Sequence, residues 1–259
     1  MWLTRRFYPP RGTSNPRVGM PVVVTGARIA AVGDLHASED HRERLVRVFA
    51  GLADVDLVLL AGDLTTHGLV EEAAVLADAC RAAGPPVVAV LGNHDHHNGL
   101  AQDISRVLTD AGVTVLDGTH AVFDVGAAQV GVAGTKGFVG GFPGAEIADF
   151  GERLLRDVYA ETSREVAALE EGLEAVAGCE TRLVLLHYAP ISETIVGEPE
   201  GIWAFLGSGR LAGPIGAHRP DAVFHGHAHH GRPLGAIGTV PVHNVARPVL
   251  PGAFHLAAF

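Results

Sequence analysis

Short apolar runs alternate along the chain with stretches in which apolar residues recur every three or four positions. The apolar runs cover residues 28–32, 56–60, 87–91, 183–186 and 222–224, and a glycine or a histidine follows each within two residues. Such runs predict strands that are buried on both faces. The stretches with helical periodicity predict helices around residues 45–52, 71–83, 104–111 and 154–176.

The order of these elements predicts an α/β fold with helices outside a central sheet layer. We expect one domain over residues 23–259, because no internal repeat or low-complexity linker divides this part of the 259-residue chain. After residue 223, glycine and proline separate short apolar runs, which predicts hairpins. Residues 1–22 are expected to form an irregular leader, within which Met20 is an alternative start of translation.

Composition narrows the class of protein. Apolar residues make up 47% of the chain, which excludes a disordered protein. The formal net charge of −10 disfavours nucleic acid and anionic membrane surfaces as partners, but it permits a small anionic substrate next to bound metal ions. No uncharged apolar run reaches the ~18–20 residues that a membrane span needs.

Compartment is predicted from the cysteines and from the start of the chain. Cys80 and Cys179 are far apart and lie in no Cys-x-x-Cys spacing, so we expect no disulfide framework. Arg5 and Arg6 are not followed by an apolar segment of the kind found in secretory signals. We therefore expect a cytoplasmic protein.

Polar side chains of an unusual kind follow the five predicted strands. They are Asp34 and His36, then Asp63, then Asn93, His94 and Asp95, then His187, and finally His227 and His229. Ligand sites in α/β sheets form beyond the carboxyl ends of the strands, so we expect these side chains to converge. The glycines that precede several of them permit a sharp turn and a close approach of the backbone.

The residue types indicate the ligand. Asp, Asn and His together favour divalent first-row metals such as Mn, Fe or Zn, and the absence of thiolates excludes a zinc–cysteine site. Seven candidate ligands exceed the needs of one ion, whereas two ions that share a carboxylate account for them. The candidates are Asp34, His36, Asp63, Asn93, His187, His227 and His229.

The series Asp-x-His, Gly-Asp, Gly-Asn-His-Asp, a single His and Gly-His-x-His runs in this order from residue 34 to residue 229. In content and order it resembles the calcineurin-like metallophosphoesterase superfamily. The resemblance implies a two-sheet β-sandwich flanked by helices. It also implies one ion on Asp34, His36 and His229, a second on Asn93, His187 and His227, and Asp63 as the bridge between them.

The resemblance also implies the chemistry. A hydroxide held between the two ions would attack the phosphorus atom of a phosphoric ester. His94 would donate a hydrogen bond to the leaving oxygen and act as general acid, and Asp95 would orient His94. A phosphodiesterase that acts on a small nucleotide-like or glycerophospho diester is the activity we favour.

The motif residues also allow three other interpretations. Taken singly, Asp34, Asp63 and Asn93 are compatible with helix caps, and only the joint pattern favours metal ligands. Phosphomonoesterases and protein phosphatases share the motifs, but the protein phosphatase branch usually has an Arg soon after Gly-Asp and a Glu after Gly-Asn-His. This chain has Leu64-Thr65-Thr66 and Asp95 there. A non-catalytic scaffold of the same fold would usually have lost a ligand or His94.

Several further residues allow two interpretations each. His225 precedes the Gly-His-x-His element and is expected to be a core or supporting imidazole. The glycine-rich stretch 134–144 is either a mobile lid with Phe138 or Phe142 on the substrate or an ordinary connection. Arg210 is expected at the surface. The remaining candidates are interpreted as solvated loop histidines, some of which could line the pocket, namely His67, His96, His97, His230 and His243.

Overall fold

Two mixed sheets form the centre of the structure, a computed structural model that describes residues 26–259. The leader predicted for residues 1–22 lies outside the described residues. The first sheet has the strand order β13 (His255–Ala258), β1 (Arg28–Val32), β2 (Leu57–Ala61), β3 (Val87–Val90) and β4 (Val113–Val115). β1 to β4 are parallel, and β13 runs antiparallel beside β1.

The second sheet has six strands, and its four central strands are parallel. The two outer strands, β11 and β5, each form an antiparallel hairpin with a neighbour. Its order is β11 (Leu234–Ile237), β12 (Val240–Asn244), β10 (Ala222–His225), β9 (Thr181–Leu185), β6 (Ala128–Gly134) and β5 (Thr119–Val125). The hairpin expected after residue 223 is confirmed, whereas the β5–β6 hairpin was not predicted.

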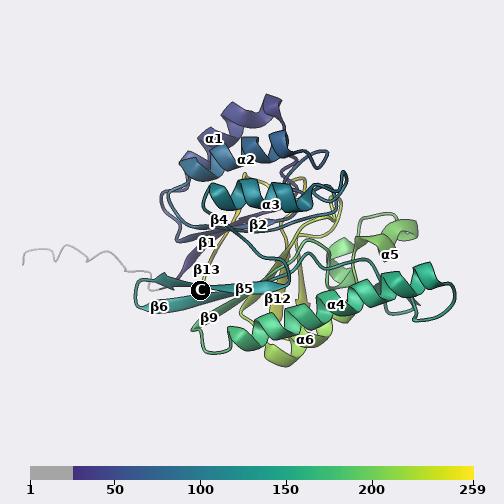
Figure 1. The fold of residues 1–259 in the computed structure, drawn as a ribbon. Coiled ribbons are helices and arrows are strands. Elements are labelled where there is room, and N and C mark those ends of the chain that lie inside the picture. The colour runs from purple at the N-terminus through teal and green to yellow at the C-terminus, as the bar shows by residue number, and fades with distance from the viewer. Residues whose placement is uncertain (1–25) are drawn as a thin grey trace, which may run out of the picture.

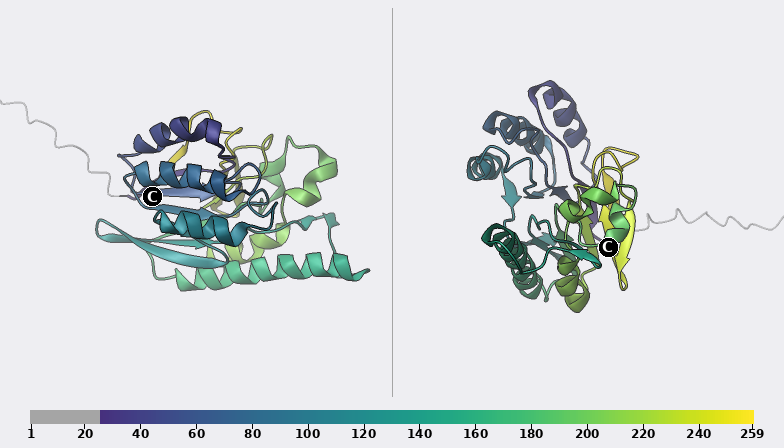
Figure 2. Two further views of the ribbon diagram at one scale, coloured as in Figure 1. Left: turned by 45° about the horizontal axis from the view of Figure 1, so that its top comes forward. Right: turned by 90° about the vertical axis from the view of Figure 1, so that its right-hand side faces the viewer.

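Helices cover the outer faces of both sheets (Figure 1). The first sheet is covered by α1 (Arg42–Ala50), α2 (Val70–Ala82) and α3 (Ala101–Asp110). α4 (Arg153–Ala175) and α6 (Ala212–His218) pack on the second sheet, and the turned views in Figure 2 agree with this layering. The two-sheet sandwich flanked by helices is therefore confirmed, as is each of the five predicted strands within a few residues.

Short elements complete the chain near the carboxyl ends of the central strands. They are the hairpin of β7 (Gly141–Phe142) and β8 (Ala145–Glu146), helix α5 (Trp203–Leu206), and the 3₁₀ turns η1 (Glu39–His41), η2 (Ser192–Ile195), η3 (Glu200–Ile202) and η4 (Gly209–Leu211). Within residues 26–259, no helix combines the length and the apolar character that crossing a membrane requires.

The packing of the core explains why the sequences of the central strands in the second sheet are continuously apolar. In β9, Leu183 and Leu185 pack in the same cluster as the first sheet, whereas Val184 packs with Leu169 and Leu173 of α4. Both faces of the strand are thus buried, and burial of each large aliphatic side chain stabilises the fold by about 2 kcal/mol. This two-sided burial holds the strand ends, and the polar residues that follow them, in fixed positions.

The two thiols are free, and they are expected to differ in reactivity. Cys80 is 6% exposed, and burial raises its pKa to about 12, so almost no reactive thiolate forms at pH 8. Cys179 is only half-buried. We expect Ellman's reagent to label one thiol in the native protein and both in guanidinium chloride. A Cys179→Ser variant that still reacts at the native rate would contradict this.

Candidate metal centre

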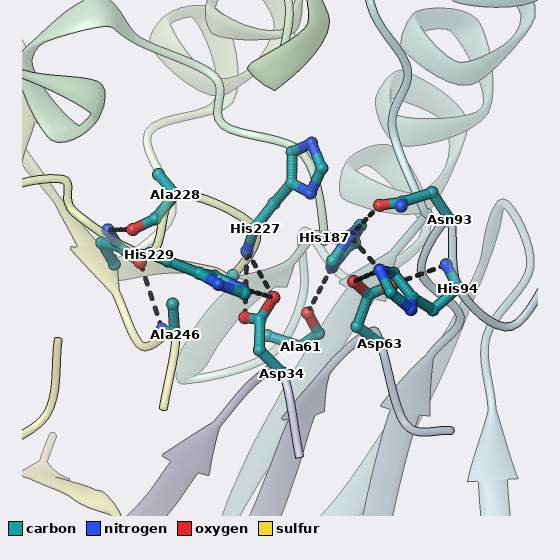
Figure 3. Close-up of polar contacts among 12 residues, drawn as sticks. Asp34, Ala61, Asp63, Asn93, His94, His187, His227, Ala228, His229 and Ala246 are labelled. Atoms are coloured by element: carbon teal, nitrogen blue, oxygen red, sulfur yellow. Dashed lines mark hydrogen bonds and ion pairs between the residues drawn. The ribbon is translucent and has the colours of Figure 1, made fainter. Parts of the chain in front are cut away.

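Five loops at the carboxyl ends of the central strands bring the predicted polar residues together. Figure 3 shows seven of them: Asp34, Asp63, Asn93, His94, His187, His227 and His229. Three loops follow β1, β2 and β3 of the first sheet, and two follow β9 and β10 of the second. Backbone hydrogen bonds tie the loops to one another. Asp34 N–H donates to the Gly62 carbonyl at 2.9 Å, and Gly226 N–H donates to the His187 carbonyl at 3.1 Å.

The backbone is strained where it carries the candidate ligands. Five residues other than glycine have a positive φ among residues 26–259, and four of them are candidates for the site: Asp34 at 58°, His36 at 45°, Asp63 at 49° and His227 at 69°. A left-handed conformation is unfavourable for such residues and concentrates at functional sites. The strain supports a functional role for these loops beyond capping or packing.

Two glycines make room for the carboxylates. A Cβ atom at Gly92 would lie 2.1 Å from Asp63 Oδ1, and one at Gly226 would lie 2.4 Å from Asp34 Oδ2. Real Cβ atoms do not approach other atoms so closely, so a larger residue at either position must displace a carboxylate. These two glycines therefore allow the backbone to approach the carboxylates closely, as predicted from the sequence.

Gly226→Ala is expected to weaken metal binding at least about 10-fold, because the new methyl group pushes Asp34 from its position. Titration of metal against a chelating dye measures this directly. Gly213→Ala in α6 is the matched control, since no atom lies within 4 Å of its added Cβ. Equal metal affinity in both variants would contradict the prediction.

One cluster of potential ligands consists of Asp34, His36 and His229. His229 Nε2 lies 2.9 Å from Asp34 Oδ1, and the backbone N–H of His227 donates to the same carboxylate at 3.0 Å. Burial raises the pKa of Asp34, but the contacts with His229 and His187 outweigh it and lower the pKa overall. Asp34 is thus held as a carboxylate, the form that binds a cation.

A second cluster consists of Asp63, His187 and His227. His187 Nε2 lies 3.3 Å from Asp63 Oδ1 and 2.9 Å from Asn93 Oδ1, so the Asn93 amide joins this cluster. His227 Nε2 lies 3.1 Å from the Phe205 carbonyl of α5. When Nε2 donates there, Nδ1 of His227 remains free to act as a ligand.

A third cluster links the other two. His36 and Asp63 lie together with His94, and all potential ligand atoms of this cluster are within 4.8 Å of one another. The ring of His36 is 4.6 Å from that of His94 and 5.7 Å from that of His229, measured between centroids. His36 and Asp63 therefore each belong to two adjoining clusters.

No lysine or arginine of the described chain pairs with the two carboxylates of the site. Asp34 and Asp63 are 3% and 2% exposed, and no lysine or arginine among residues 26–259 forms an ion pair with either. Burial lowers the pKa of His227 to about 4, so this imidazole is neutral. Buried carboxylates without a lysine or arginine partner fit bound metal ions, as the mixed oxygen and imidazole donors also do.

His94 is oriented differently from the prediction. Its Nδ1 lies 2.6 Å from the Thr66 carbonyl, and its Nε2 lies 3.8 Å from Asp63 Oδ2. Asp95 makes no hydrogen bond with His94. It accepts hydrogen bonds from the backbone N–H groups of Leu64, Thr65 and Gly92 and from the Thr65 hydroxyl. Asp95 thus holds the loop that presents Asp63, and the Thr66 carbonyl orients His94.

Two residues near the second cluster were not predicted from the sequence. Tyr188 is 5% exposed, and its ring centroid is 4.6 Å from that of His227. Burial raises the pKa of its hydroxyl, so it stays protonated. The only feature of the sequence that could have identified Tyr188 is its position directly after His187. Phe205, whose carbonyl contacts His227, carried no motif signal at all.

The remaining candidates fall outside the three clusters. His225 is fully buried and contacts Thr194 Oγ1 at 2.9 Å, as expected of a core imidazole. Phe142 is buried, and the backbone of residues 137–141 is hydrogen-bonded to α4 and to the segment around α5, so stretch 134–144 is an ordered connection. Arg210 stacks on Tyr159 at 4.1 Å and is held at the surface of α4.

The five remaining candidate histidines either contact other side chains or are exposed. His67 contacts Glu72 at 2.8 Å, and His230 contacts Glu198. The ring of His243 stacks on Phe224. His96 and His97 are exposed in the turn after His94.

Solved structures show the same fold. The phosphopantetheinyl hydrolase of Mycobacterium tuberculosis superposes with a TM-score of 0.67 at 15% identity, covering 91% of this chain and 97% of its own. The protein TT1561 of Thermus thermophilus superposes with a TM-score of 0.57 at 18% identity, covering 87% and 91% respectively. The sequence has no significant match among curated proteins.

The family is shown by the sequence itself. Residues 27–231 match the calcineurin-like phosphoesterase family, a span that includes every candidate ligand. This match and the ligand clusters, which suit divalent metals, support a metal-dependent phosphoesterase. The chain belongs to the calcineurin-like phosphoesterases.

Proposed function

We propose that this phosphoesterase hydrolyses a small-molecule phosphodiester with two divalent metal ions, taken from Mn, Fe and Zn. The observation that carries the proposal is that the three ligand clusters adjoin one another. Asp63 lies between the cluster that contains Asp34 and the cluster that contains His187. Bound there, the ions would supply Lewis-acid activation of water and of the phosphoryl oxygens. Nucleotide-like and glycerophospho diesters are the substrates we favour.

The ligand roles follow from the clusters. We assign Asp34, His36 and His229 to one ion and Asn93, His187 and His227 to the other, with Asp63 shared. His36 also lies near Asp63 and His94, which supports the shared position of Asp63.

His94 is proposed to carry the proton to the leaving oxygen. With both ring nitrogens protonated, Nδ1–H donates to the Thr66 carbonyl, and Nε2–H is directed to the side of the site where Asp63 lies. The His94 side chain is 43% exposed, so a substrate can reach it. The backbone N–H of His94 donates to Asp63 Oδ1 at 2.9 Å and fixes the two residues relative to each other.

A diester fits the charges of the site better than a monoester does. The second negative charge of a monoester favours a cationic side chain beside the metals. The loop after Asp63 has Leu64, Thr65 and Thr66 where protein phosphatases of this superfamily usually carry an Arg. Lys136, beyond Tyr188, already pairs with Glu165 at 3.4 Å. These features support a monoanionic substrate.

Hydrolysis of bis-p-nitrophenyl phosphate and of p-nitrophenyl phosphate, each with Mn²⁺ and with chelator, tests the proposal. Chelator-sensitive turnover that favours the diester is the expected result. A preference for the monoester would replace the proposal with a phosphomonoesterase. Failure to turn over either substrate, with two metal ions per chain in elemental analysis, would favour a binding role.

We also propose that the protein acts in the cytoplasm on a soluble substrate and has no nucleic-acid partner. The free thiols of Cys80 and Cys179 and the net charge of −10 support this.

A further inference from the structure

A cavity of about 200 Å³ lies between helix α1 and the segment 247–254, apart from the metal centre. None of the seven candidate metal ligands lines it, and neither does His94. The cavity nonetheless adjoins the loop that carries Asp34 and His36. Leu35, between Asp34 and His36, forms part of its wall, and the backbone N–H of Arg247 donates to the Gly33 carbonyl at 3.0 Å.

The floor of the cavity is apolar. Leu45, Phe49 and Phe254 line it, and the two phenylalanine rings meet edge to face with centroids 5.4 Å apart. An apolar cavity of about 150 Å³ is large enough to bind benzene. The volume at α1 therefore accommodates a single ring, or a short branched chain, together with a small substituent.

The lining also contains two cations without a partner. Arg44 and Arg247 form no ion pair and no side-chain hydrogen bond with any residue of 26–259. Arg42, two positions earlier in the chain than Arg44, instead contacts both Glu39 and Asp78. In a chain of net charge −10, two uncompensated guanidinium groups at one hollow favour an anion, to which they donate paired hydrogen bonds.

We propose that this cavity is a binding site for a small organic acid, with one ring or a short branched alkyl body and one carboxylate or sulfonate group. The body lies on Phe49 and Phe254, and the acid group binds Arg44 and Arg247. The ligand is not the phosphoester substrate, because the metal ligands do not line the cavity. The site is independent of the activity proposed for the metal centre.

Benzenesulfonate is a suitable probe, since sulfonates coordinate metals weakly. Isothermal titration of the metal-loaded protein is expected to give a Kd of about 1 mM, typical of a ligand of this size. The double variant Arg44→Gln/Arg247→Gln is expected to bind at least about 10-fold more weakly. Arg47→Gln/Arg232→Gln removes the same charge from two unpaired arginines outside the cavity and should bind like the wild type.

A further variant locates the bound probe. Ala253 is exposed and lines the cavity, so Ala253→Leu fills the space without disturbing the core and should abolish binding. Absence of heat up to high probe concentration, equal losses in the two double variants, or unchanged binding to Ala253→Leu would each overturn the proposal.

Discussion

His94→Ala is expected to lower kcat/KM by about 10²–10⁴-fold on a diester with an alkyl leaving group and far less on bis-p-nitrophenyl phosphate. An alkoxide needs a proton as it departs, whereas p-nitrophenolate leaves without one. The geometry provides the donor, since the Thr66 carbonyl fixes Nδ1 of His94 at 2.6 Å and directs Nε2 into the site. Kinetics on both substrates, together with the metal content of the variant, measure the effect.

His97→Ala is the control for this experiment, because His97 is exposed in the same turn and contacts no candidate ligand through its side chain. It should leave both rates unchanged. An equal loss on both substrates would argue against proton donation. Loss of a metal ion from His94→Ala would instead make His94 a ligand, as its cluster with His36 and Asp63 permits.

The architecture of the site could be predicted because it depends on local patterns. Runs such as 57–61 and 87–90 are buried on both faces, so their sequences read as strands without tertiary information. Parallel strands end at the same edge of a sheet, which places Asp63 and Asn93 near each other once the strands are known. The same reasoning applied to β9 and β10 places His187 and His227.

The parts that escaped prediction depend on contacts between distant segments. The carbonyl that orients His94 belongs to Thr66, and the carboxylate of Asp95 turns toward Thr65 and Gly92. A motif gives the residue types at such positions but not the direction of each side chain. In β5, half-buried residues alternate with exposed ones and no residue is fully buried, so the strand lacks the continuous apolar run of a strand buried on both faces.

The contact between Glu165 and the segment 135–137, which adjoins His187, is the clearest example of such a long-range contact. Glu165, in the middle of α4, accepts hydrogen bonds from the Thr135 hydroxyl and from Gly137 N–H at 2.9 Å. Its other oxygen lies 3.4 Å from Lys136 Nζ. Helical spacing places Glu165 on the buried face of α4 with Thr162 and Leu169, but the sequence does not show that its partner is Lys136 of a distant loop.

Glu165→Gln is expected to lower the free energy of unfolding by about 3 kcal/mol, because it leaves the charge of Lys136 buried without its partner. Glutamine keeps an acceptor for Thr135 and Gly137, so the change isolates the charge. Burial already lowers the pKa of Lys136, and Glu165 opposes this shift. Urea unfolding followed by circular dichroism measures the loss, which corresponds to a fall in Tm of about 6–12 °C.

The same variant should also weaken metal binding at the second cluster. The Lys136 carbonyl accepts hydrogen bonds from the N–H groups of His187 at 3.1 Å and Tyr188 at 3.0 Å, so movement of Lys136 is transmitted to a candidate ligand. Lys136→Met/Glu165→Gln removes both charges and should recover most of the stability.

Glu161→Gln, one turn earlier in α4, is the matched control, since Glu161 pairs with Arg164 at the surface. Exposed pairs of this kind contribute about 0–1 kcal/mol, so the control should unfold almost like the wild type. Two outcomes would contradict the assignment of Glu165 and Lys136 as a buried pair. One is equal stability of Glu165→Gln and Glu161→Gln, and the other is a double variant less stable than Glu165→Gln alone.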